Sequence, residues 1–80
     1  FNPNINIDFS IPYRTMVNID VYDIKGNKIK TLVSQNLDAG FISLNWNGIN
    51  DSGTFISSGV YLIKINAGDQ QITQKITMLK

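Results

Sequence analysis

The chain has 80 residues, with seven basic and six acidic side chains and a formal net charge of +1. This length supports one small domain with a single core. A content of 42% hydrophobic and 16% charged residues excludes a disordered tail. Because the basic residues are scattered along the chain, the charge balance does not indicate a nucleic-acid-binding surface. No segment approaches the roughly 18 apolar residues of a membrane helix, so we expect no membrane insertion.

Two residue types with reactive side chains are missing from the chain. It contains no cysteine and no histidine, which excludes disulfides, thiolate metal sites and nucleophiles activated by imidazole. All six acidic residues are aspartates: Asp8 and Asp20 on outward strand faces, and Asp23, Asp38, Asp51 and Asp69 in expected turns. A carboxylate pair set across a substrate cleft is therefore not indicated. We predict a protein that is not an enzyme, with no catalytic, metal or cofactor site.

The first half of the chain reads as alternating strands. Residues 4–11 and 16–23 each place an apolar side chain at every second position, which predicts half-buried strands. Residues 23–27 suit a type I turn followed by a left-handed Gly26, so residues 28–33 should return antiparallel. In that strand Leu32 breaks the alternation, which predicts a bulge or an edge position. Residues 34–40 are expected to form a polar connection.

The centre of the predicted core is Trp46, which closes the alternating run of Ile42 and Leu44. Asn47-Gly48 and the stretch 50–53 predict two turns, and a short strand is expected around 54–56. Strands at 60–67 and 70–79 follow, joined by a hairpin at Gly68-Asp69. Strands at spacings of about 8 to 12 residues with no helical pattern predict an all-β fold. We expect an antiparallel immunoglobulin-like β-sandwich of about seven strands, as one domain over residues 1–80.

Two groups of side chains are candidates for small-ligand binding. Oxygen ligands for calcium are offered by Asn45, Asn47, Asn50 and Asp51. This group has one formal charge and lacks the spacing of an EF-hand, so turn formation is the favoured interpretation. A platform for sugar rings could be formed by Tyr13, Tyr22, Phe41 and Phe55. Isolated aromatic residues on a surface are ordinary, so edge packing is favoured for these four.

Several short motifs follow one another in an informative order. The chain opens with Phe1-Asn2-Pro3; residues 19–26 read IDVYDIKG, residues 38–40 DAG, residues 46–48 WNG, residues 58–61 SGVY and residues 75–80 KITMLK. Together they resemble the C-terminal sorting domain of the type IX secretion system of Bacteroidota, in its type A or Por secretion family. Asn47 stands where that family often has aspartate, and the upstream half of its opening motif is absent.

The resemblance implies a non-catalytic C-terminal signal that directs a fused N-terminal cargo domain through the periplasm to the cell surface or medium. Its implied partners are the outer-membrane translocon and a sortase-like peptidase. The implied recognition residues are Gly59, Val60, Tyr61, Lys75, Ile76, Thr77, Met78, Leu79 and Lys80. A purely structural role is the alternative for Gly59 and Tyr61. A similar module of the flagellar hook-capping protein is the nearest alternative function, followed by a scaffolding or carbohydrate-binding accessory module of a secreted enzyme.

Overall fold

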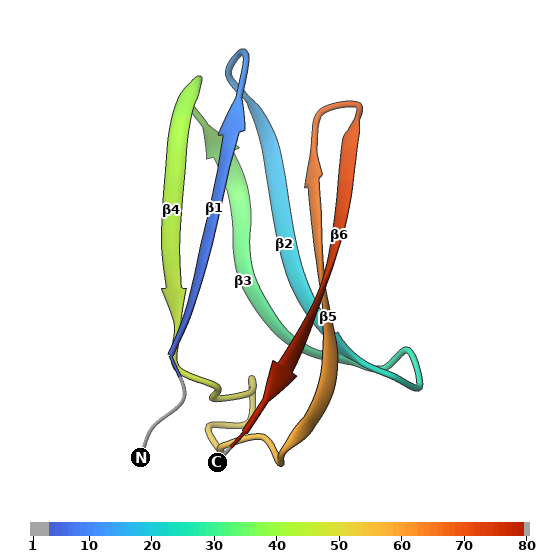
Figure 1. Ribbon diagram of the computed structural model, residues 1–80. Helices are drawn as coiled ribbons and strands as arrows, with labels where there is room; N and C mark the ends of the chain where they lie inside the picture. The colour runs from blue at the N-terminus through green and yellow to red at the C-terminus, as the bar shows by residue number, and fades with distance from the viewer. Residues whose placement is uncertain (1–3, 80) are drawn as a thin grey trace.

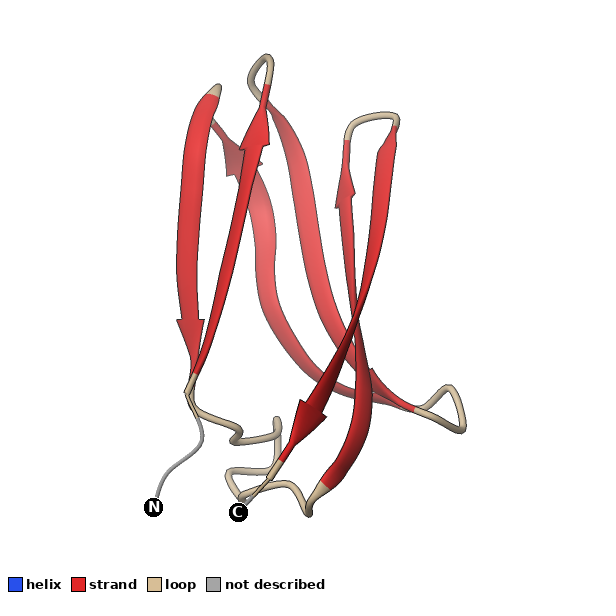
Figure 2. Cartoon of the chain, in the orientation of Figure 1, coloured by secondary structure: helices blue, strands red, loops and turns tan. Residues whose placement is uncertain are grey.

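The computed structural model describes residues 4–79, and its regular structure consists of strands. These are β1 (Ile5–Ile11), β2 (Thr15–Asp23), β3 (Lys28–Leu37), β4 (Gly40–Trp46), β5 (Gly59–Ala67) and β6 (Gln70–Met78). They form a two-stranded sheet, β1-β4, and a four-stranded sheet in the order β3-β2-β5-β6 (Figure 1). Every pair is antiparallel, and turns and loops join the strands (Figure 2). The predicted all-β immunoglobulin-like sandwich is therefore confirmed.

Two details of the predicted strand pattern need correction. Residues 34–37, expected in a connection, extend β3, because Ser34, Gln35 and Asn36 pair with β2 although they are polar. Strand pairing uses backbone N–H and C=O groups, which polar residues also supply, so a polar segment can extend the ladder. The short strand expected around 54–56 is reduced to an isolated bridge between Ile49 and Phe55. The described part of the chain therefore contains six strands, and a seventh is not formed.

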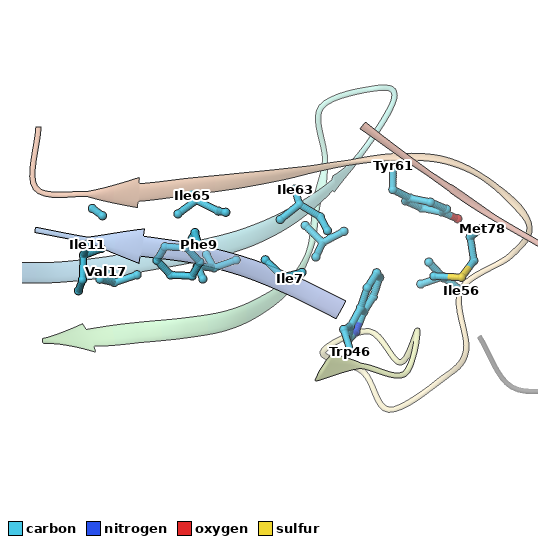
Figure 3. Close-up of a cluster of buried hydrophobic side chains, with 13 residues drawn as sticks. Ile7, Phe9, Ile11, Val17, Trp46, Ile56, Tyr61, Ile63, Ile65 and Met78 are labelled. Carbon is cyan, nitrogen blue, oxygen red and sulfur yellow. The ribbon is translucent and has the colours of Figure 1, made fainter. Parts of the chain in front are cut away.

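The core lies between the two sheets and is entirely apolar. Alternation along the strands directs one face of each sheet inward, as expected for a sandwich. The buried hydrophobic residues that form it are Ile7, Phe9, Ile11, Val17, Ile19, Val21, Trp46, Ile56, Tyr61, Ile63, Ile65, Ala67 and Met78. Trp46 is 2% exposed and closes one end of the core, beside Ile56, Tyr61 and Met78 (Figure 3). Trp46 is thus buried in the core as predicted, but it lies at one end of the core and not at its centre.

The larger sheet is irregular along β3. Its register with β2 shifts twice, between Ile19 and Asp20 and between Val21 and Tyr22. The shifts leave Leu32 and Ile29 of β3 opposite no residue of β2, and both side chains pack against the core. A bulge allows the strand to turn such side chains inward while the ladder continues on either side. The broken alternation in this strand is thereby explained.

The crossing from β4 to β5, residues 47–58, closes the bottom of the sandwich in Figure 1. The indole Nε1–H of Trp46 donates to the carbonyl oxygen of Ile49 over 3.0 Å. Asp51 attaches the crossing to β3, since its backbone N–H donates to the carbonyl oxygen of Ile29 over 3.0 Å and its carboxylate lies 3.7 Å from the ammonium of Lys30. These contacts hold the loop against the edge strand β3.

Candidate protein-interaction surface

The structure brings the two predicted recognition segments together as one ladder. Gly59 pairs with Met78, Val60 with Thr77, and Tyr61 with Ile76, while Lys75 pairs with Leu62. Residues 59–61 and 75–78 therefore lie side by side on β5 and β6. Leu79 follows them and is 69% exposed, and Lys80 lies outside the described residues. The grouping is consistent with one surface, but the side chains in it serve different purposes.

Part of this ladder is structural. Tyr61 is 7% exposed, and its hydroxyl donates to the carbonyl oxygen of Ser57 over 2.7 Å. Gly59 has φ of +157°, a backbone conformation that residues with a side chain rarely adopt, which fits its place between the crossing and β5. Met78 is buried, whereas Val60, Thr77 and Lys75 are exposed. The residues that a partner can reach are therefore the outward-facing ones.

Strand β6 is exposed on both of its faces over most of its length. Directly opposed residues of an antiparallel pair lie on the same face, so the partners of Ala67, Ile65 and Ile63 point inward. Those partners are Gln70, Ile72 and Gln74, and all three are nevertheless exposed, Ile72 by 44%. The two-stranded sheet is narrower than the four-stranded one and leaves this part of β6 uncovered (Figure 1). An apolar side chain thus lies on an open edge.

The outer face of the four-stranded sheet carries a group of lysines that are separate in the sequence. The charged residues of its described strands on this face are Lys28, Lys64, Lys75 and Asp20. Asp20 is only 9% exposed, and it accepts a 2.9 Å hydrogen bond from the hydroxyl of Thr31 and lies 3.9 Å from Lys28. Lys64 lies 4.7 Å from the ring centroid of Tyr22, a cation–π contact. The exposed charge of this face is therefore positive.

This face could not be recognised in the sequence, because its lysines lie far apart along the chain. Lys64 lies opposite Asp20 across one ladder and opposite Thr73 across the next, which brings it near Lys75. The alternation does place Lys64 and Lys75 on outward faces, and this is the signal that was available. Their proximity depends on β6 pairing with β5 in this register, which the spacing alone does not define.

The candidate calcium ligands are engaged in turns and ladders. The amide of Asn45 donates to Asn6 across the β1-β4 pair over 2.7 Å. Asn47 Oδ1 accepts the backbone N–H of Ile49 over 3.2 Å, and Asn50 Oδ1 accepts three donors from Ser52 and Thr54 at 3.0 to 3.1 Å. Within residues 4–79, no three side chains of the types His, Cys, Asp or Glu are grouped as metal ligands. The turn-forming interpretation therefore describes this cluster.

The candidate aromatic residues do not line up as one platform. Phe41 is 70% exposed at the start of β4, and Tyr13 is 51% exposed in the turn between β1 and β2. Phe55 is 48% exposed but lies in the crossing, at the other end of the sandwich, and Tyr22 is half-buried under Lys64. Stacking on a sugar chain requires neighbouring rings on one face, and these four come from separate parts of the surface.

Among residues 4–79, the titratable side chains with shifted pKa values are Tyr13 and Asp23, and both belong to turns. The backbone N–H of Asn27 donates to Asp23 over 2.9 Å and lowers the pKa of that carboxyl. The hydroxyl of Tyr13 donates to Asp69 over 3.1 Å, and this bond, followed by the aspartate charge, raises the pKa of Tyr13. Both groups are solvent-exposed, so these shifts describe turn stabilisation and not the chemistry of an enclosed site.

A helix that could cross a bilayer is not found among the residues that the structure describes. The described geometry defines instead an immunoglobulin-like β-sandwich with open strand edges and one basic sheet face. A model of the FlgD Ig-like domain family matches residues 4–71. Because this match covers most of the chain, the protein belongs to the FlgD Ig-like domain family.

Solved structures agree with this assignment at the level of the fold. FlgD from P. aeruginosa superposes with a TM-score of 0.72 at 22% identity, covering 94% of this chain and 58% of that one. FlgD from Xanthomonas campestris, described in connection with hook capping essential for flagellar assembly, gives a TM-score of 0.70 at 23% identity, covering 92% and 54%. This chain therefore spans less than two thirds of either. No curated protein matches the chain.

These comparisons contradict the resemblance to the type IX sorting domain. The matched family and the solved structures are of the FlgD type, so the predicted sorting function was wrong. The outer-membrane translocon, the sortase-like peptidase and the fused cargo are not supported as partners, nor is an accessory module of a secreted enzyme. The motifs SGVY and WNG did not identify the function because their residues stabilise the fold. The hydroxyl of Tyr61 donates a hydrogen bond to the carbonyl oxygen of Ser57, and the indole N–H of Trp46 donates to that of Ile49.

Proposed function

We propose that this chain is a non-catalytic assembly module of a flagellar hook-capping protein, acting through protein–protein contacts during hook assembly. The observation that carries the proposal is the family match over residues 4–71, which spans β1 to β5 and the start of β6. Hook capping in flagellar assembly, the process described for the Xanthomonas campestris protein, supplies the biological setting. Because the chain spans 54 to 58% of the two FlgD chains, the proposal concerns one module of such a protein.

The distribution of polar side chains supports a binding role over a chemical one. The acidic and amide side chains in the turns accept backbone hydrogen bonds, as at Asp23 and Asn50. On the two-stranded sheet, the hydroxyl of Ser43 donates to Asp8 across the strands over 2.6 Å. What is left for interaction is exposed strand surface, which suits recognition by another protein.

The location and the domain context are part of the proposal. The secreted or cell-surface position expected from the sequence, and a larger parent protein in which this chain is one domain, are both compatible with a flagellar component. Proteinase added to intact cells should degrade an epitope-tagged parent protein, while a cytoplasmic control protein stays intact. Protection of the tag until the cells are lysed would contradict the surface location.

The role itself is tested by deleting codons 4–79 from the parent gene in its source bacterium. We expect swimming to be lost and electron micrographs to show missing or uncapped hooks, with both restored by the intact gene. A second strain carrying Lys25→Glu, at an exposed hairpin tip, serves as the control for expression and folding. Normal hooks in the deletion strain, or a source bacterium that builds no flagellum, would overturn the proposal.

A further inference from the structure

Strand β6 is the longest unbroken edge in the described structure. It pairs with β5 from Gln70 to Met78 without a register shift. The other edge of the same sheet, β3, is interrupted twice and carries Lys28 and Lys30. The strands β1 and β4 have seven residues each, against nine in β6. Bulges and lysines are common devices that prevent a strand edge from pairing, and β6 has only Lys75.

The two faces of this edge are complementary to different side chains in a partner strand. On the inner face, Ile72 is exposed and Ile76 is half-buried, so an apolar neighbour would remove apolar surface from water. On the outer face, Lys75 is exposed. Lys64 lies on the neighbouring strand β5, opposite Thr73. An acidic side chain opposite Lys75 would form a favourable cross-strand pair.

On its outer face, this edge is poorly suited to a second copy of the chain. In the antiparallel pairing of two β6 strands about Gln74, Ile72 would lie opposite Ile76 of the second copy on the inner face, but Lys75 would lie opposite Thr73 on the outer face. The two Lys75 side chains would then be diagonal neighbours, with a Lys64 behind each Thr73. The aspartate of this face, Asp20, is buried and already bound, so it does not offset this repulsion. Like charges at such positions destabilise a sheet.

We propose that the open edge of β6, Gln70–Met78, binds an extended segment of another protein in which apolar residues alternate with acidic ones. The segment adds a fifth strand to the four-stranded sheet, with main-chain hydrogen bonds supplying affinity and the alternating side chains supplying selectivity. Its apolar residues lie beside Ile72 and Ile76, and its acidic residues face Lys75. The inference rests on this chain's own edge and goes beyond the flagellar role.

The experiment titrates the ¹⁵N-labelled 80-residue chain with capped nine-residue peptides, followed by NMR. One peptide alternates valine with glutamate, one alternates valine with lysine, and one has the glutamate peptide's composition in scrambled order. We expect the glutamate peptide to bind, with the largest amide shifts in Gln70–Met78. The lysine peptide should bind at least about threefold more weakly, since opposite-charge and like-charge cross-strand pairs differ by this order. The scrambled peptide should also bind at least about threefold more weakly, because it no longer places apolar residues on one face and acidic residues on the other.

The variant Lys75→Glu distinguishes charge pairing from non-specific peptide binding. Its side chain is exposed, so the fold should be retained, and its preference should reverse towards the lysine peptide by about three- to tenfold. The control Lys25→Glu makes the same charge change away from β6 and should keep the original preference. Equal binding of all peptides, shifts centred on β1 or β4, or no binding at millimolar concentration would overturn the proposal. A dimer of the chain that pairs through β6, detected first by its mass in sedimentation, would overturn the proposal as well, because a second copy would then occupy the edge.

Discussion

At the scale of single residues, Tyr61 shows how a side chain connects a loop to the core. It stands near the start of β5, and its hydroxyl reaches back four residues to the carbonyl oxygen of Ser57. The arrangement is similar to the tyrosine corner of immunoglobulin-like sandwiches, in which a tyrosine bonds to the backbone a few residues upstream. One side chain thereby packs in the core and fixes the end of the crossing.

We expect Tyr61→Phe to lower the free energy of unfolding by about 0.5 to 1.5 kcal/mol, because it removes one partly buried hydrogen bond and keeps the ring. Urea denaturation followed by circular dichroism measures the change. Tyr13→Phe removes an exposed hydrogen bond to Asp69 and serves as the matched control, with an expected change below about 0.5 kcal/mol. Equal losses in the two variants would contradict the corner-like role.

Asp23 predicts a defined pH dependence. Its pKa is lowered in the folded state, chiefly by the backbone N–H of Asn27, so the ionised carboxylate favours folding. This contribution is complete above the ordinary pKa of an unfolded aspartate, about 3.9, and is lost as the pH falls through the lower folded pKa. The stability difference between the native chain and Asp23→Ala should therefore shrink below about pH 4.

An NMR titration of the Asp23 carboxyl carbon provides an independent measurement. Asn27→Ala removes the side-chain donor and keeps the backbone one, so the pKa should remain below its ordinary value. A midpoint at or above the ordinary value in the native chain would show that the turn does not hold the carboxylate in solution.

At the scale of elements, the crossing depends on Asn50, whose side-chain oxygen accepts from the backbone of Ser52 and from both the backbone and hydroxyl of Thr54. We expect Asn50→Ala to cost about 1 to 2 kcal/mol of unfolding free energy, because three donors lose one acceptor. Hydrogen exchange should accelerate in residues 48–56 before it does in β2. Asn47→Ala, which removes a single bond to Ile49, should cost less. A larger loss for the Asn47 variant would reverse this ranking.

The strands could be predicted well because most of them bury one face. A strand such as β5 must alternate, since Tyr61, Ile63 and Ile65 enter the core while their neighbours do not. The polar end of β3 carried no such signal, because pairing along an edge requires only backbone groups. The regions that alternate were found, and the region held by hydrogen bonding alone was missed.

The structure pairs the candidate recognition segments on β5 and β6, but the sorting function attached to them was wrong. Short motifs around turns report backbone and core requirements, as the bond from Tyr61 to Ser57 illustrates. They identify the sandwich and do not separate the families that use it. Lys64 and Lys75 lie outside the core and carry no pattern of their own in the sequence, so they could be considered together only after the ladders had placed them on one face.

At the scale of the whole molecule, the two hairpins β2-β3 and β5-β6 were predicted, but the long-range pairings β1-β4 and β2-β5 were not readable from the sequence. β1 pairs with β4 across the intervening hairpin, so the two sheets are interleaved along the chain. Neither sheet can bury its inner face without the other, which predicts cooperative, two-state unfolding. The fluorescence of the single tryptophan, buried at the end of the core, should give the same urea midpoint as circular dichroism. Two separated midpoints would indicate that one sheet persists alone.

The start of β1 and the end of β6 lie at the same end of the sandwich (Figure 1). Tension applied between these two ends would therefore load each outer strand at its tip, where Ile5 meets Trp46 and Met78 meets Gly59. Inter-strand hydrogen bonds loaded in this direction break one after another from the strand tip, and the force is not shared among them. A domain built in this way yields readily to traction through its termini, even though its core is well packed.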